Sequence, residues 1–242
     1  MIVLIITAVR VKSMDSHRIS GRILAENIAG PGMLRLVEQS MQSRAQKTSV
    51  TEIAVKERKY PQAALTFDDG PDIRYTPLLL DGLKERNVRA SFFLLGEKVE
   101  QYPELVERMQ KEGHLVGNHT YHHVQLNKLN ETKAREEILK TNNLIYETTG
   151  VYPLYLRPPF GAWKKNLELC VEMLPVFWTI DTLDWKVQNT EKIVRTVQEQ
   201  IEDGAIILMH DEYDTSVEAA LQVADDLKAQ GYQLVTVDQL IL

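Results

Sequence analysis

From Tyr60 to the end of the chain, short apolar runs rich in β-forming residues alternate about seven times with amphipathic helical patterns. This alternation predicts a parallel sheet whose strands are joined by crossover helices. The expected strands cover residues 63–67, 90–95, 115–118, 154–156, 176–180, 205–209 and 233–237. The helices are expected to begin near Thr76, Pro103, Asn130 and Thr190, which are suitable cap or first-turn residues. Such a sheet can close into a barrel or stay open as a doubly wound sheet.

Polar segments follow five of the expected strands at the point where each strand ends. They are the pair Asp68 and Asp69, the segment beginning at His119, "RPPFG" at 157–161, "DTLDW" at 181–185, and His210. In α/β barrels the carboxyl ends of the strands meet at one face, and active sites are built there. We therefore expect these five segments to form a single site.

The regular pattern occupies residues 60–242 of the 242-residue chain, a length that an α/β barrel commonly folds as one domain. Residues 1–59 form an N-terminal extension with an apolar start, an amphipathic stretch and a polar linker. The apolar run "MIVLIITAV" is too short to span a bilayer by itself and has no basic residues before it. A buried strand, the remains of a signal anchor and a degenerate export signal all stay open. We favour envelope targeting, with a cytoplasmic location as the alternative.

Composition narrows the classes of partner and cofactor. The formal net charge is −6 and no block of basic residues occurs, which argues against nucleic acid as the main partner. Nothing in the sequence indicates a stable protein partner. Cys170 is the only cysteine, so the chain can form neither an intramolecular disulfide nor a thiolate metal cluster. Any metal must therefore be bound by histidine and carboxylate.

The segment "HTYHH" supplies candidate metal ligands. His119 and His123 are four residues apart, a spacing that places both imidazoles on one face if the segment forms a helical turn. His122 competes with His123, since spacing alone does not exclude it. Two histidines and one carboxylate leave coordination positions open for water and substrate, as in a catalytic site. One of Asp68 and Asp69 can complete this set, and the other is then free to accept a proton from water that the metal acidifies.

Three further residue types complete a hydrolytic site. His210 suits a general acid, because its pKa lies near neutrality and a neighbouring carboxylate, Asp181 or Asp184, can raise that pKa. The guanidinium group of Arg157 stays positively charged and can hold a carboxylate through two parallel hydrogen bonds. The prolines that follow it stiffen the loop, so that the amide near Phe160 can face an oxyanion.

Aromatic side chains flank these loops. Trp163 and Trp185 lie beside "RPPFG" and within "DTLDW", and an exposed indole is a natural platform for the apolar face of a sugar. Ordinary packing explains each of them equally well. His114, by contrast, is expected to have a local structural role.

The five segments together resemble the polysaccharide deacetylases of the NodB-homology class, carbohydrate esterase family 4. The resemblance covers residues 60–242, and its motifs occur in the family's order: "TFDDGP" at 66–71, "HTYHH" at 119–123, "RPPFG" at 157–161, "DTLDW" at 181–185 and "ILMH" at 207–210. It implies a distorted (β/α) barrel with about seven parallel strands, fewer than the usual eight repeats. The N-terminal extension is not covered by this resemblance, so no fold or function is implied for it.

The resemblance also implies a role for each site residue. The catalytic set is Asp68 as base, His210 as acid, Arg157 holding the base, and Asp181 tuning His210. The metal ligands are Asp69, His119 and His123, and family members usually carry Zn²⁺, with Co²⁺ or another divalent ion in some. The substrate-binding set is the backbone amide of Phe160 for the oxyanion, with Trp185 and Leu208 around the acetyl methyl. Many relatives have tyrosine where this chain has Phe160, which leaves the role of the backbone unchanged.

The activity implied is metal-dependent removal of N-acetyl groups from N-acetylglucosamine units of a polysaccharide, peptidoglycan before chitin-type oligosaccharides. Two alternatives within the family are an O-acetyl esterase acting on xylan and a hydrolase of non-sugar amides. A catalytically silent glycan-binding module is the alternative from another class of protein. That alternative predicts a missing catalytic residue, and none of the five motifs lacks one.

Overall fold

The computed structural model describes residues 59–163 and 173–241. All of them belong to Arg58–Leu242, one of the two units into which the chain divides. Most of the expected N-terminal extension, with its apolar run, lies outside the described residues, as does Cys170. The boundary expected near residue 60 therefore stays a prediction. No helix among the described residues is long and apolar enough to cross a membrane.

Eight short parallel strands form one sheet in the described part of the chain, with the order β5-β4-β3-β2-β1-β7-β6 and with β8 paired to β1. Their bounds are β1 (Gln62–Asp68), β2 (Ser91–Leu94), β3 (Leu115–Asn118), β4 (Tyr155–Leu156), β5 (Leu174–Pro175), β6 (Ile180–Asp181), β7 (Ala205–His210) and β8 (Gln233–Leu234). The sheet is curled and flanked by helices, so the prediction of a distorted (β/α) barrel is confirmed. The long central strand β1 places Asp68 opposite His210 of β7.

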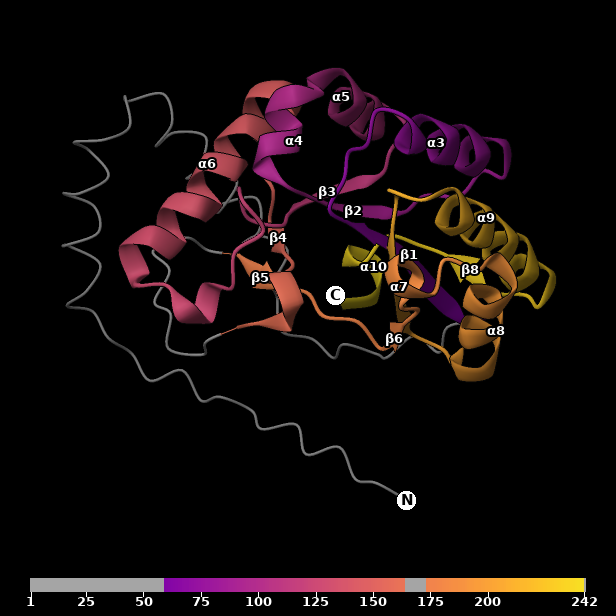
Figure 1. Ribbon diagram of the computed structural model, residues 1–242. Helices are drawn as coiled ribbons and strands as arrows, with labels where there is room; N and C mark the ends of the chain where they lie inside the picture. Colours follow the sequence, from indigo (N-terminus) through magenta and orange to yellow (C-terminus); the bar gives the residue numbers. More distant parts are fainter. Residues whose placement is uncertain (1–58, 164–172, 242) are drawn as a thin grey trace, which may run out of the picture. The chain divides into compact units, whose positions relative to one another are not determined.

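The helices lie around the outside of the strands (Figure 1). Their bounds are α3 (Tyr75–Glu85), α4 (Gly96–Gln101), α5 (Pro103–Lys111), α6 (Glu131–Thr149), α7 (Asp184–Val187), α8 (Thr190–Gln200), α9 (Asp214–Ala229) and α10 (Asp238–Ile241). Two 3₁₀ turns cover Leu126–Lys128 and Pro159–Gly161. Asn130 caps α6, and α8 begins at Thr190 with Asn189 as its cap, so both expected helix starts are confirmed.

The strand expected at 176–180 is wrong in detail, because this segment crosses between two parts of the sheet. Its first residue, Val176, directly follows β5, and the N–H of Val176 donates to the carbonyl of Leu156 in β4. Its end belongs to β6, where the N–H of Thr179 donates to the carbonyl of Ile206 in β7. The segment thus connects β5 to β6, which are the two ends of the sheet path. This crossing carries the following "DTLDW" segment to the edge of β7, beside His210.

The core packs between β1 and the surrounding helices. β1 buries Leu65 and Phe67, and α8 buries Ile193, Val194 and Val197 along one face with helical spacing. His114 has the structural role expected of it: it is buried, and its Nδ1 accepts the N–H of Ala90 at 3.0 Å. Burial lowers the pKa of His114 to about 4, which keeps it neutral and able to accept this bond.

Candidate active site and metal centre

Asp68 and Asp69 both face one cavity of about 490 Å³ at the carboxyl ends of the strands. Consecutive residues of a strand normally point to opposite faces of the sheet. Asp68 is the last residue of β1, and Asp69 has a left-handed backbone with φ 68°. The strand therefore ends between them, the alternation is broken, and both carboxylates line the same cavity. The segment "TFDDGP" is a turn that presents two acids to one site.

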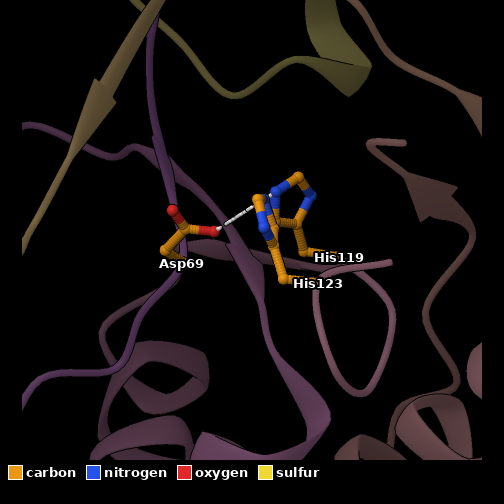
Figure 2. A group of neighbouring side chains, drawn as sticks. All are labelled: Asp69, His119 and His123. Carbon is orange, nitrogen blue, oxygen red and sulfur yellow. Dashed lines mark ion pairs between the residues drawn. The ribbon is translucent and has the colours of Figure 1, made fainter. Parts of the chain in front are cut away.

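Asp69, His119 and His123 form a group with the geometry of a metal site (Figure 2). Asp69 Oδ1 lies 3.4 Å from the Nε2 atoms of both histidines, and one ligand atom of each residue lies within 4.8 Å of the others. Asp69 Oδ1 is buried and makes no hydrogen bond among the described residues. A buried, unpaired oxygen that faces two imidazole nitrogens fits a bound cation, and this donor set suits Zn²⁺ and similar ions.

Neighbouring groups prepare these ligands for a cation. His119 Nδ1 lies 2.6 Å from the carbonyl oxygen of Arg157 and donates to it, which leaves Nε2 free as a ligand. Burial alone would raise the pKa of Asp69. The close approach of His119 and the charges of His123 and His210 outweigh burial and hold that pKa well below its usual range. Asp69 is therefore a carboxylate at neutral pH.

The "HTYHH" segment forms a loop and no helical turn, so helical spacing is not what brings His119 and His123 together. Thr120 and His123 have left-handed backbones, with φ 67° and 53°. These two turns direct His119 and His123 toward Asp69, and the ring of His122 points elsewhere, with Nδ1 2.8 Å from Glu137 Oε1. Spacing left His122 open as a ligand, and the structure places it away from the cavity.

Asp68 is held by a buried arginine. Arg157 Nη1 donates to Asp68 Oδ1 at 2.8 Å and to Thr66 Oγ1 at 2.7 Å, and the arginine side chain is fully buried. The Thr66 hydroxyl in turn donates to the carbonyl of Ile207. Asp68 Oδ2 remains 3.7 Å from His119 Nε2, on the side of the ligand group. One carboxylate oxygen is thus anchored and the other faces the cavity.

His210 is paired with Asp184, so the expectation that Asp181 tunes this histidine is wrong. Asp184 Oδ1 lies 2.7 Å from His210 Nδ1, and Asp184 Oδ2 accepts the backbone N–H of His210 at 2.8 Å. Asp184 is fully buried at the start of α7. Asp181 lies three residues earlier, at the end of β6, where it accepts the N–H of Leu183 and lines the cavity. The left-handed backbone at Leu183 turns the chain so that Asp184, rather than Asp181, contacts His210.

Asp184 changes the protonation of His210. Burial would lower the pKa of His210, but the hydrogen bond and charge of Asp184, with the charges of Asp68 and Asp69, raise it to about 9. The same pairing lowers the pKa of Asp184 against the effect of burial. His210 is therefore a cation at neutral pH, with Nδ1 bound to Asp184 and Nε2 3.8 Å from Asp69 Oδ2.

The cavity wall is largely aromatic and aliphatic. Phe160, Trp185 and Leu208 line it, as the resemblance implied, and Trp185 is 48% exposed. Trp178 also lines it and was missed by sequence reasoning, because nothing in the run before "DTLDW" distinguishes it from a packed tryptophan. Trp163 packs against a core cluster instead and does not line this cavity. The remaining lining residues are Leu183, Glu212 and Tyr213, together with the aspartates and histidines described above.

Phe160 contributes more than its backbone. It has a left-handed backbone with φ 59°, and its ring lies 4.5 Å from the ring of His123 between centroids. The N–H groups of Gly161 and Ala162 donate to carbonyls within the same turn, and the two prolines before Phe160 have no N–H. The rigid turn thus fixes the position of the Phe160 amide and of the Phe160 ring that packs against His123.

Gly70 allows the two-aspartate turn to pack against a buried acid. A Cβ at Gly70 would lie 2.6 Å from Asp211 Oδ1, and Asp211 is fully buried and accepts a hydrogen bond from Thr76. We expect Gly70→Ala to lower the free energy of unfolding by about 1–3 kcal/mol, because the buried Asp211 carboxylate would have to shift to make room for the added methyl group. Denaturant unfolding of both proteins measures this difference in the free energy of unfolding.

The same clash provides an internal control. In the Asp211→Ala background, Gly70→Ala should cost clearly less, since the acid that it meets is gone. An equal cost in both backgrounds would show that Asp211 is not the reason for the glycine.

Comparison with known proteins gives consistent matches. The model of the polysaccharide deacetylase family matches residues 56–176. The chain is 42% identical over 185 residues to the peptidoglycan-N-acetylglucosamine deacetylase PgdA of Listeria monocytogenes, covering 76% of this chain and 40% of that protein. It is 44% identical over 177 residues to the peptidoglycan-N-acetylmuramic acid deacetylase PdaC of Bacillus subtilis, covering 73% of this chain and 38% of that protein.

A solved structure agrees with these matches. The structure of the peptidoglycan deacetylase PdaC from Bacillus subtilis superimposes with a TM-score of 0.73 at 43% identity, over 76% of this chain and 91% of that one. The present chain spans about two fifths of the length of the two curated relatives. The similarity thus concerns the unit that holds the cavity.

Proposed function

Because this chain belongs to the polysaccharide deacetylase family, we propose that it removes N-acetyl groups from N-acetylglucosamine units of peptidoglycan, releasing acetate. The observation that carries the proposal is the arrangement of three kinds of group around one cavity. These are a buried carboxylate held by Arg157, a three-ligand group centred on Asp69, and a cationic histidine held by Asp184. Amide hydrolysis needs a base, an electrophile and an acid. The base and one metal ligand come from the end of β1, the other two ligands follow β3, and the acid ends β7.

The metal is a divalent cation held by Asp69, His119 and His123, with Zn²⁺ as our first choice and Co²⁺ as the alternative. When bound, such an ion polarises a carbonyl and acidifies water. One carboxylate and two imidazoles are a donor set that Zn²⁺ and Co²⁺ both accept.

The protein residues handle the protons of the reaction. Asp68, oriented by Arg157, accepts a proton from the attacking water through its unanchored oxygen. The amide of Phe160 donates to the oxyanion that forms at the acetyl carbon. His210 then gives a proton from Nε2 to the departing nitrogen, since its Nδ1 is bound to Asp184. The C–N bond breaks, and the products are acetate and a free amine.

The walls of the cavity suit an acetylated sugar. Leu208 and Trp185 offer apolar surface to the acetyl methyl, and the exposed indole of Trp185 can stack on a sugar ring. A second candidate substrate is the N-acetylmuramic acid unit, which the PdaC relative's name favours at a similar identity. Both units occur in peptidoglycan, so the two candidates differ only in which sugar loses its acetyl group. We further propose that the protein works in the cell envelope, where this substrate lies.

A substrate panel tests this proposal. We expect acetate release from peptidoglycan and from N-acetylchitooligosaccharides. Analysis of the product should show new amines on glucosamine rather than on muramic acid. Release from acetylated xylan or from non-sugar amides alone would assign the site to another reaction of the family. Binding of glycan without acetate release over long incubation would indicate a silent module.

The His210–Asp184 pair predicts a specific pH dependence. Because His210 acts as an acid, kcat/KM should stay level near neutrality and fall as pH rises through about 9. Asp184→Asn removes the charge that raises the pKa of His210, and burial then lowers that pKa. The alkaline limb of the kcat/KM profile should therefore move to lower pH.

Asp181→Asn is the matched control for this change, since it removes a carboxylate of the same segment that does not touch His210. Its alkaline limb should stay in place. A limb that moves with Asp181→Asn and not with Asp184→Asn would contradict the assignment.

A further inference from the structure

A carboxylate outside all five motifs holds the loop that carries His119 and His123. Glu137 lies in α6, and its Oε2 accepts the backbone N–H groups of Tyr121 at 3.0 Å and His122 at 2.9 Å. Its Oε1 lies 2.8 Å from His122 Nδ1. One side chain thus makes three hydrogen bonds to two consecutive residues between the two metal ligands. Hydrogen bonds to an ionised acceptor are stronger than those between neutral groups.

The loop needs such a restraint because its backbone is strained. Thr120 and His123 are left-handed, on either side of the two residues that Glu137 binds. Non-glycine residues in this conformation are unfavourable and persist only where the surroundings hold them. Before Tyr121 and His122, the N–H of Thr120 donates to Asn118 Oδ1 at 2.7 Å. Glu137 supplies the bond next to His123 on its N-terminal side, and on the other side the N–H of Val124 donates to Thr120 Oγ1 at 3.2 Å.

Glu137 is itself firmly placed. α6 buries Ala134 and Ile138 on either side of it, and Glu137 has a side chain only 16% exposed. The side chain of Asn118, at the end of β3, donates to the carbonyl of Ile138 and to Asn142 Oδ1. These bonds tie α6 to the strand that precedes the ligand loop. The carboxylate is therefore fixed relative to the strand end.

The same contact separates two adjacent histidines. Glu137 binds the ring of His122 on the helix side, while His123 Nε2 lies 3.4 Å from Asp69 Oδ1. If the backbone between them relaxed, the ring of His123 would leave its position beside Asp69. Glu137 thus acts on the metal site through the loop and touches none of the three ligands.

We propose that Glu137 is a positioning residue that sets the metal affinity of the site and keeps His123, rather than His122, directed at the metal. The proposal rests on the metal site that the proposed function assigns to Asp69, His119 and His123. Loss of a group that orients a metal ligand by direct hydrogen bonding typically weakens metal binding by about 10–100-fold, and Glu137 orients His123 through the backbone of the loop. We expect a loss in this range for Glu137→Ala.

The test measures Zn²⁺ and Co²⁺ affinity of the full chain by competition with a chromogenic chelator. Glu137→Ala should bind both ions about 10–100-fold more weakly than the wild type. Glu137→Gln should recover most of the affinity, because its side-chain oxygen can still accept both backbone N–H groups. Glu136→Ala is the matched control, since Glu136 is an exposed residue of the same helix and the same charge is lost. It should bind like the wild type.

Two further variants keep the test informative. His122→Ala removes the ring contact and leaves both backbone bonds to Glu137, so its metal affinity should stay near that of the wild type. If Glu137→Ala does not fold, Glu137→Asp retains the charge but withdraws the carboxylate from the loop, and it should show the same weakening. Thermal unfolding of the metal-free proteins separates a loss of fold from a loss of affinity.

The outcomes distinguish this proposal from the proposed function. If the wild type binds neither ion, the metal site itself is refuted. If the wild type binds and folded Glu137→Ala binds equally well, the role of Glu137 is overturned while the metal site stands. A Glu137→Gln variant as weak as Glu137→Ala would also overturn the account, because the backbone bonds would then not be the cause.

Discussion

Asp68→Asn should lower acetate release by about 10²–10⁴-fold, the range that general base catalysis contributes. Asparagine has nearly the same shape and can still accept the hydrogen bond from Arg157, but it cannot take a proton from water. Asp68 is not one of the three ligands, so Zn²⁺ affinity should stay at the wild-type level. Acetate release and metal affinity, measured on the same preparation, together check the prediction.

Stability must be measured alongside, because the substitution leaves a buried arginine without its partner carboxylate. Arg157 is fully buried, and breaking a buried ion pair of this kind costs about 3–5 kcal/mol. The activity assay is therefore run where unfolding curves show the variant to be folded. Folded Asp68→Asn protein with wild-type acetate release would refute Asp68 as the base.

Asp69→Ala should abolish metal binding and acetate release together. Asp69 is the sole anionic member of the three-residue group, and its Oδ1 lies 3.4 Å from the Nε2 atoms of both histidines. We expect the affinity for Zn²⁺ to fall by more than about 100-fold, beyond the loss caused by an outer partner. Metal competition and acetate release measure the two effects.

Substitutions at the two aspartates are thus predicted to have different effects. Asp68→Asn loses activity and keeps the metal, whereas Asp69→Ala loses both. Asp72→Ala is a useful contrast within the same turn: its Oδ1 accepts the N–H groups of Arg74 and Tyr75, so its loss should affect stability first. If Asp69→Ala bound Zn²⁺ normally, the ligand assignment would be wrong.

Much of the barrel was predictable because local patterns repeat along it. β3 has the bounds expected from its sequence, and β1, β2 and β7 differ from expectation by one residue at one or both ends. Each is a buried run that ends at a polar residue, which both periodicity and composition signal. The segment at 174–181 was harder, because one short run pairs with β4 at one end and β7 at the other. Periodicity carries no information about such a change of partner.

The site shows the same division. Asp68, Asp69, His119, His123 and His210 come together because parallel strands place their carboxyl ends side by side, and the sequence reveals those ends. The choice between Asp181 and Asp184 depended on a left-handed turn at Leu183, which spacing does not reveal. The hydrogen bonds from the loop to Glu137 depend on the packing of α6 beside the loop, although Glu137 lies 16 residues after Tyr121 in the sequence. Contacts of this kind follow from tertiary packing.

The most direct test of the central claim is acetate release from peptidoglycan by the purified full chain, before chelation, after chelation, and after Zn²⁺ or Co²⁺ is restored. We predict release that disappears with the chelator and returns with the divalent ion, and that is lost in Asp69→Ala under all three conditions. Release that continues unchanged after complete removal of metal would contradict the account.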